Sequence, residues 1–548
     1  MDFYRLSFVS CCLFLLFAWT HGSAQGETFT MTPLGVNNFL ITPWDLHYGP
    51  DDQLWVTERS TGVISRVSPI NGARDNLIQI QEMSSTAGQD GLLGIALHPD
   101  LLGNNPYVYL SYTYLVQGER RQRLVRYTYS IDNGDGSLSA PQILLENLPS
   151  SNDHNSGRLV VGPDDKLYYS IGDQGGNQNA NFCNPILSQV LPTQAEIDQE
   201  DWTHYPGKIL RLNLDGSIPT DNPLLAGVRS YIYSYGHRNP QGLAFGSNGF
   251  LYSDEHGPNT DDEVNRIVAG GNYGWPNVVG FQDDQAYDYC NWSSATDCEN
   301  LNYANGGCPA GVTLEEESSF LDSAYREPMF SLFAVPDTYD FNAPGCQNSW
   351  ICRPNVAPSS LAIYESEGIP GWDASLLVVS LKRGRIYRLK LDANGEVVQG
   401  DTLQYLYTRN RYRNLVVDPD GKTFYVITDQ SGRTSSLDGL SALNDLQNPG
   451  NILKFTLDES TSNAAALDQN RIRMWPNPAS QQISVEIPLD LSGPMEAELI
   501  GMNGTVVQTF SDLRPGIQEL QLKQLPAGIY VFRLHANDQH WQQRLVWR

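Results

Sequence analysis

A short motif recurs along this chain, in which turn-forming residues are followed at once by an apolar run typical of a strand. Pro-Asp turns stand at positions 50–51, 163–164 and 419–420, and an Asn-Gly turn stands at 248–249. Each precedes a run of aromatic and branched residues, such as Leu54-Trp55-Val56. Pro, Asp and Gly supply the backbone angles of turns, and aromatic and β-branched residues suit buried strands. Repeated hairpin units of this kind predict a β-propeller with long insertions. A β-sandwich with coincidental turns is the alternative.

A second motif, Gly-x-Ile with a basic residue two positions after the Ile, ends several of these units, at 207–212, 384–389 and 450–455. Side chains alternate along it, which predicts one face in a core and the other in water. The chain is 18% charged and contains 48 glycines and 32 prolines, as suits an all-β protein rich in turns. A formal net charge of −27 argues against nucleic acid and anionic membranes as partners.

The two ends of the chain read differently from the middle. Residues 1–24 have the form of a signal peptide, with Arg5, an apolar run from Phe8 to Trp19, and small residues up to Ala24. That run is too short to span a bilayer, and no other stretch predicts a transmembrane segment. We therefore expect an exported protein, with a propeller over 25–457, a polar linker over 458–470 and a small antiparallel β-sandwich over 471–548.

Six cysteines follow the predicted signal peptide, and six cysteines allow 15 disulfide pairings. Cys346 and Cys352 bracket one short loop, so we predict a disulfide between them. The pairing of Cys183, Cys290, Cys298 and Cys308 stays open. None of the six lies in a C-x-x-C motif, which disfavours zinc.

Candidate chemical groups lie on separate loops. His154 stands just before a Pro-Asp turn, and Asp173 follows one strand later, where it can hold the imidazole in one tautomer. Arg238 can stabilise negative charge near such a base. Lys382, Arg411 and Arg413 form a basic group in an acidic chain, and the two arginines share one face of a strand. Such a pair can clamp a polycarboxylate, although solvated surface charge is the alternative.

An acidic turn at 257–263 is a candidate calcium site, with Asp283 and Asp284 further along the chain. Calcium prefers several oxygen ligands, including backbone carbonyls. Acidic runs that are only solvated give the same pattern.

Seven short motifs, in order from about Leu46 to Leu457, resemble the glucose/sorbosone dehydrogenase family, whose soluble members use pyrroloquinoline quinone (PQQ). They lie at 88–94, 153–154, 236–242, 257–258, 271–276, 380–384 and 410–413. The resemblance implies a six-bladed propeller that oxidises an aldose to its lactone. It makes His154 the base that takes the anomeric hydroxyl proton while hydride passes to the quinone C5. It also implies that Asp173 orients His154 and that Arg238 stabilises the charge on the quinone.

The resemblance further implies the binding residues. PQQ is held by Gln89, Arg238, Asn239, Lys382, Arg411 and Arg413. The sugar contacts Gln89, Asp153, His154, Gln178 and Arg238. Backbone oxygens of Gly257 and Pro258 bind a calcium ion beside PQQ. Further calcium, structural or at a homodimer interface, draws on Glu263, Tyr273, Val279, Phe281, Asp283 and Glu317. Trp350, Arg353 and Asn355 depart from the family pattern, which leaves the preferred sugar open. The sequence does not give the natural electron acceptor.

The tail from Met474 to Ala479, with Pro526-Ala527-Gly528-Ile529-Tyr530, resembles the C-terminal sorting domain of type IX secretion cargo. It implies passage through the periplasm to the cell surface or medium, by way of the type IX machinery. A carbohydrate-binding or adhesion module is the alternative for the tail. For the whole chain, the alternatives are a calcium-dependent lactonase-type hydrolase and a non-catalytic sugar-binding propeller.

Overall fold

The computed structural model comprises two compact units, residues 27–462 and 463–548. The structure describes residues 27–547 except 87, 305–306, 342–349, 437–440, 459–464, 467–472, 477–478, 480, 489–494, 502–505, 524, 526–527 and 537–538. The predicted signal peptide and most of the predicted linker therefore lie outside the described residues. Among the described residues, no helix has both the length and the apolar character needed to cross a membrane.

The larger unit contains six four-stranded sheets in its described residues, all with antiparallel neighbours. The first is β2 (Pro43–Tyr48), β3 (Leu54–Glu58), β4 (Val63–Val67) and β5 (Arg74–Gln79). The second is β6 (Leu92–Leu97), β7 (Tyr107–Val116), β8 (Glu119–Asp132) and β9 (Asp135–Pro149). The third is β10 (Leu159–Val161), β11 (Lys166–Ile171), β12 (Lys208–Asn213) and β15 (Ile232–Tyr235).

The remaining three sheets follow the same plan. The fourth is β16 (Pro240–Phe245), β17 (Leu251–Glu255), β18 (Asp262–Ile267) and β21 (Phe330–Leu332). The fifth is β22 (Pro358–Tyr364), β23 (Ser375–Ser380), β24 (Ile386–Leu391) and β25 (Val397–Tyr405). The sixth has the order β26 (Tyr412–Val417), β27 (Thr423–Thr428), β30 (Ile452–Leu457) and β1 (Phe29–Pro33), so the N-terminal strand completes the sheet made by the C-terminal strands of the unit.

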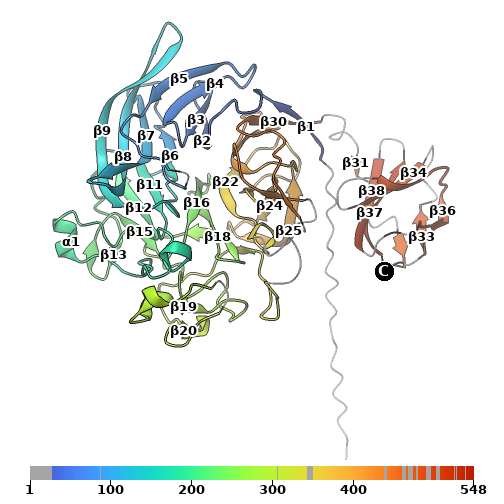
Figure 1. Cartoon of the computed structure of the whole chain (residues 1–548). Helices are drawn as coiled ribbons and strands as arrows, with labels where there is room; N and C mark the ends of the chain where they lie inside the picture. The colour runs from blue at the N-terminus through green and yellow to red at the C-terminus, as the bar shows by residue number, and fades with distance from the viewer. Residues whose placement is uncertain are drawn as a thin grey trace, which may run out of the picture. The chain divides into compact units, whose positions relative to one another are not determined.

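The first strand of each sheet touches the first strand of the next, in the cycle β2, β6, β10, β16, β22, β26 and back to β2. The sheets therefore surround a common centre as the blades of a propeller (Figure 1). Short elements lie in the connections: α1 (Gln194–Asp198), β13 (Leu224–Leu225), β14 (Val228–Arg229), β19 (Tyr289–Asn291), β20 (Thr313–Glu315), β28 (Thr434–Ser435), β29 (Ala442–Leu443), and 3₁₀ turns η1 (Asn179–Asn181), η2 (Trp292–Ser294), η3 (Cys298–Asn300), η4 (Glu317–Ser319) and η6 (Trp350–Cys352). The predicted all-β class is confirmed.

Because blades pack face to face, strands inside each blade are covered on both sides. Strands β3, β17, β23 and β27 are buried along their whole length. The expectation that the second motif has one solvent-exposed face is wrong for β12, where five of six residues are buried, including Lys208. The Nζ of Lys208 instead donates to the carbonyls of Leu187, Ser188 and Pro206.

The smaller unit has a five-stranded sheet, in the order β31-β38-β37-β34-β35, and a three-stranded sheet, in the order β32-β33-β36. The strands are β31 (Ala465–Ala466), β32 (Arg473–Trp475), β33 (Gln482–Ile487), β34 (Met495–Gly501), β35 (Val506–Phe510), β36 (Gly516–Gln521), β37 (Gly528–Ala536) and β38 (Gln539–Trp547). All described pairs are antiparallel except the short β31–β38 pair. Side chains of both sheets, such as Val485 and Phe532, share one core, which gives a small sandwich.

Candidate active site

Loops at one end of the propeller carry the predicted site residues. Since neighbouring strands are antiparallel, the loop before each inner strand and the loop after each second strand lie at the same end. His154 and Arg238 precede the inner strands β10 and β16, while Asp173 and Lys382 follow the second strands β11 and β23. The repeat therefore gathers side chains that are far apart in the sequence.

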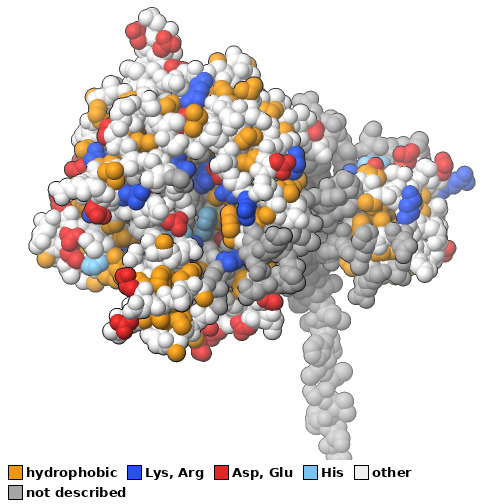
Figure 2. Space-filling model, viewed as in Figure 1, with side chains coloured by type: hydrophobic (Ala, Val, Ile, Leu, Met, Phe, Trp, Pro, Cys, Tyr) orange, Lys and Arg blue, Asp and Glu red, His pale blue; other side chains and the backbone are white. Residues whose placement is uncertain are grey.

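A cavity of about 350 Å³ lies among these loops. The predicted residues that line it are Gln89, His154, Arg238, Gly257, Pro258, Lys382, Arg411 and Arg413. Trp350, Arg353 and Asn355 line it as well. In Figure 2, Lys and Arg side chains and histidine atoms gather around the hollow near the centre of the propeller face.

Positive charge dominates the wall of this cavity. No aspartate or glutamate is among its described lining. Six of the residues that line it are basic: Arg59, Arg238, Arg353, Lys382, Arg411 and Arg413. The whole chain has a formal net charge of −27, so the cavity runs against the overall field. Such a local concentration of donors is suited to a ligand with several negative charges.

Asp429 orients two of these cations. Its Oδ2 accepts from Arg411 Nε at 3.0 Å, and its Oδ1 accepts from Arg413 Nε at 2.9 Å. Burial by itself raises the pKa of Asp429, but Arg413 and Arg411 hold that pKa below its ordinary value. Burial lowers the pKa of Lys382, which Asp262 opposes, and a bound anion would favour the charged lysine.

His154 is held in one orientation from behind. Its Nδ1 lies 2.7 Å from Asp173 Oδ1, and both side chains are buried. Asp173 also accepts from Trp275 Nε1 at 2.9 Å and from the backbone of Gly175 at 2.9 Å. Because an ionised carboxylate only accepts, Nδ1 of His154 carries the proton and the lone pair is on Nε2. Nε2 is the atom available to take a proton.

Gln178 connects the groups around that lone pair. Its Nε2 lies 3.2 Å from both His154 Nε2 and Asp153 Oδ2, and its Oε1 accepts from Arg238 Nη2 at 3.0 Å. Gln89 Nε2 donates to the other oxygen of Asp153 at 2.5 Å. The predicted sugar-contacting residues therefore form one hydrogen-bonded group beside the base.

Two buried donors near the cavity have no hydrogen-bond partner among the described residues. They are Arg238 Nε and Asn239 Nδ2. Asn239 is fully buried, and its Oδ1 already accepts from Ser156 and Gln241. Unpaired buried donors are costly unless a ligand or water satisfies them. Together with the cationic wall, they fit a cofactor with several carboxylate and carbonyl oxygens.

The predicted calcium residues fall in two places. Gly257 and Pro258 line the cavity, where a Cβ on Gly257 would lie 1.9 Å from Thr260 O, so the turn needs glycine. Farther away, Glu263 Oε1 accepts from Gly280 N at 2.7 Å, and Glu317 Oε1 accepts from Val279 N at 2.9 Å. Both carboxylates therefore converge on one loop.

Backbone oxygens would have to supply most of the ligands at either place. The hydroxyl of Tyr273 donates to Arg266 O at 2.6 Å, which leaves Tyr273 its carbonyl. Phe281 and Asp283 lie exposed on the same loop. Within the described ranges, no three His, Cys, Asp or Glu side chains form a metal-binding group. Carbonyl-rich turns of this kind suit calcium better than transition metals.

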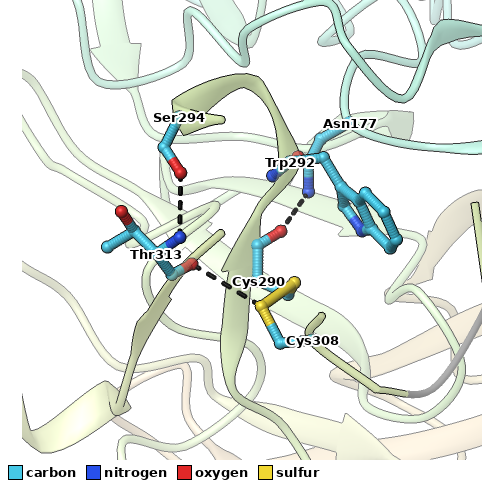
Figure 3. Close-up of a disulfide and its surroundings, with 6 residues drawn as sticks. All are labelled: Asn177, Cys290, Trp292, Ser294, Cys308 and Thr313. Atoms are coloured by element: carbon cyan, nitrogen blue, oxygen red, sulfur yellow. Dashed lines mark hydrogen bonds between the residues drawn. A yellow bond between two sulfur atoms is a disulfide. The ribbon is translucent and has the colours of Figure 1, made fainter. Parts of the chain in front are cut away.

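Two disulfides lie wholly within the described residues. Cys183 bonds to Cys298, and Cys290 bonds to Cys308, with Cα–Cα distances of 5.7 and 5.5 Å. Figure 3 shows the second of these and its surroundings. The predicted Cys346–Cys352 pair includes Cys346, which lies outside the described residues.

Sequence reasoning missed several residues of the site, namely Trp44, Arg59, His256, Trp275 and Asp429. Arg59, His256 and Asp429 each directly follow the second strand of a blade, the position that Lys382 and Asp173 nearly share. The repeat itself therefore carried the signal, since every residue at that position lies at the same end of the propeller.

The fold and the cavity define a class of protein: a β-propeller with a cavity lined by basic side chains and a carboxylate-oriented histidine. A family model described as Glucose / Sorbosone dehydrogenase matches residues 40–305 and 336–436. The chain belongs to the glucose/sorbosone dehydrogenase family. A second family model, described as Secretion system C-terminal sorting domain, matches residues 473–548.

Known relatives agree with this assignment. Quinoprotein glucose dehydrogenase B of Acinetobacter calcoaceticus is 48% identical over 443 residues, which cover 79% of this chain and 92% of that protein. Aldose sugar dehydrogenase YliI of Escherichia coli (strain K12) is 27% identical over 397 residues, 72% of this chain and 88% of that protein. The PQQ-bound form of an aldose sugar dehydrogenase from Streptomyces coelicolor superposes with a TM-score of 0.52 and 26% identity, over 79% of this chain and 99% of that one.

Proposed function

We propose that this chain oxidises the anomeric carbon of a glucose-like aldose to the lactone, with PQQ as the oxidant and calcium beside it. The observation that carries the proposal is the cavity itself, which sets the available Nε2 of a buried histidine against a wall of six cations. The names of the relatives support it, since one is a quinoprotein glucose dehydrogenase and a structural neighbour holds PQQ.

The proton is handled by this chain's own residues. His154 Nε2 takes it from the anomeric hydroxyl, and Asp173 stabilises the imidazolium through the Nδ1 hydrogen bond of 2.7 Å. When bound, PQQ supplies the two-electron oxidant that accepts the hydride from the same carbon. The sugar thereby loses one proton and one hydride, which makes the lactone.

The cofactor and the sugar would divide the cavity between them. Gln89, Arg238, Asn239, Lys382, Arg411 and Arg413 would hold PQQ. Arg238 would balance negative charge on the cofactor. Carbonyl oxygens of Gly257 and Pro258 would bind calcium, which polarises a bound carbonyl. Asp153 and Gln178, with Gln89, would contact the sugar next to the base.

Further calcium would bind at the loop that Glu263 and Glu317 hold, using oxygens of Tyr273, Val279, Phe281 and Asp283. Burial raises the pKa of Glu317 to about 8, and a bound cation would favour its ionised form. This loop is also where we propose a homodimer contact.

We propose that the smaller unit directs the chain to the type IX secretion machinery. Residues 1–24 would direct it to the periplasm, and residues 471–548 would then take it to the cell surface or medium. The match to a sorting-domain model supports this route.

The proposed function is tested by reconstitution. The purified chain is given PQQ and calcium, an aldose is added, and dye reduction and product are measured. We expect aldose-dependent reduction with a lactone as product, and neither without PQQ. A chain that binds PQQ but oxidises no aldose would refute the proposed reaction.

A further inference from the structure

The loop that carries Gln178 has an unusual backbone. Asn177 and Asn179, on either side of Gln178, have φ angles of 60° and 47°. Side-chain-bearing residues seldom adopt this left-handed region, and asparagine adopts it more readily than most. Such a conformation persists only where its surroundings hold it in place. Contacts with neighbouring residues therefore hold Asn177 in this conformation.

Asn177 is held by the long insertion between β18 and β21. Its Nδ2 donates to the carbonyl of Cys290 at 2.9 Å, and its Oδ1 accepts from the backbone of Trp292 at 2.8 Å (Figure 3). The side-chain amide thus satisfies backbone groups at both ends of one short stretch, from β19 into η2. Moving Asn177 would break both bonds together.

Two disulfides make that insertion a firm support. Cys290–Cys308 closes the segment that contains Trp292, and Thr313, just beyond that segment, donates from its backbone N to Ser294 Oγ at 2.8 Å. Cys183–Cys298 ties the far end of the Gln178 loop to the same insertion. The loop is therefore fastened to the insertion before Gln178, through Asn177, and after it, through Cys183.

We propose that Asn177 is a positioning residue, which couples this twice-crosslinked insertion to Gln178 and so fixes the amide of Gln178 against the base. Gln178 is the residue that contacts His154 Nε2, Asp153 and Arg238 together. Freed from Asn177, its amide would no longer define where the sugar hydroxyl meets the lone pair of His154. The kinetic part of this inference rests on the proposed function.

The test is Asn177→Asp in the full chain with PQQ and calcium. Aspartate tolerates the left-handed backbone and can still accept from Trp292, but it cannot donate to Cys290 O. Because small misplacements near reacting atoms are costly, we expect kcat/KM for glucose to fall about tenfold or more, with PQQ affinity unchanged. Asn179→Asp is the matched control: the same change at an exposed neighbour that also has a positive φ, with kcat/KM expected to be unchanged.

A double-mutant cycle separates positioning from stability. If Asn177 acts through Gln178, then Asn177→Asp adds no further loss in a Gln178→Ala background. Losses that multiply would overturn the inference, and so would a lower melting temperature with unchanged kcat/KM. Should Asn177→Asp fail to fold, the pair Cys290→Ser with Cys308→Ser takes its place in the same cycle, with the same expected loss of kcat/KM.

Amide hydrogen exchange gives a reading that does not depend on catalysis. In the chain without PQQ, backbone amides of residues 174–184 should exchange faster in Asn177→Asp than in Asn179→Asp. Equal exchange in the two variants would contradict the coupling. If the wild-type chain oxidised no aldose, the proposed function would fail, and this comparison would still decide whether Asn177 holds the Gln178 loop.

Discussion

Replacing Arg411 and Arg413 with alanine should weaken PQQ binding, because both side chains line the cavity proposed to hold the cofactor. Both side chains are mostly buried at the cavity, with exposed fractions of 11% and 16%. A hydrogen bond to a charged group contributes about 1.5–3 kcal/mol, so the loss of two arginines costs about 3–6 kcal/mol. That corresponds to a rise of about 10² to 10⁴-fold in the PQQ concentration for half-reconstitution.

Asp429 adds a second contribution to this loss. In the double variant its carboxylate stays behind the cavity wall without the two guanidinium groups that now pair with it. Its charge would then repel an anionic cofactor. Adding Asp429→Asn to the double variant should therefore recover part of the affinity.

The assay is a titration of the unloaded chain with PQQ, followed by both tryptophan fluorescence and activity. Arg409→Ala is the control, because Arg409 lies two residues away, is half exposed and pairs with Asp445. Titration curves of the double variant that overlay those of the wild type would refute the assignment of this wall to the cofactor.

Three further predictions concern the base, the metal and the tail. Asp173→Asn should lower turnover about 10- to 100-fold, since it removes a charged hydrogen bond to His154, and His154→Ala should lower turnover at least ~10²-fold. Stopped-flow rates check both variants, and additive effects in the double variant would contradict a shared role. Calcium chelation should abolish activity and lower the melting temperature, because a metal bound only by the native state stabilises it; full activity in excess chelator would exclude the metal. A chain ending near Glu459 should stay active but remain in the periplasm of the native host. A chain ending before Ile452 should not fold, since it lacks β30, the partner of β1 and β27. Loss of activity in the chain ending near Glu459 would make the tail part of the enzyme, and normal secretion of that chain would reject the sorting role.

Local sequence predicted the class of fold and the principal groups of the site. The turn motifs and the apolar runs after them predicted where hairpins begin, because turn residues and β-branched runs act locally. The proximity of His154 and Asp173 was also readable, since they flank a single strand pair, β10 and β11. What alternation alone could not show is that both faces of β12 are covered, because neighbouring blades come from distant sequence.

The partners supplied by distant segments were not predictable from local pattern. Asp429 is not such a case, because it lies 16 residues beyond Arg413 on the β26–β27 hairpin and was predictable in the same way as the pairing of His154 with Asp173. The cysteine pairs depend on how the insertion between β18 and β21 folds back over the Gln178 loop. Spacing between cysteines carries no information on that path, which is why the pairing of Cys183, Cys290, Cys298 and Cys308 had to come from the structure.

The central claim, that this cavity uses His154 and PQQ to oxidise an aldose, is tested most directly by a single half-reaction. The chain is loaded with PQQ and calcium without any dye, glucose is added, and the absorbance of the bound quinone is followed in wild type and His154→Ala. We predict rapid reduction in the wild type, with one lactone formed per PQQ, and reduction at least ~10²-fold slower in the variant. Equal rates in the two proteins, or bound quinone that glucose does not reduce, would contradict the account.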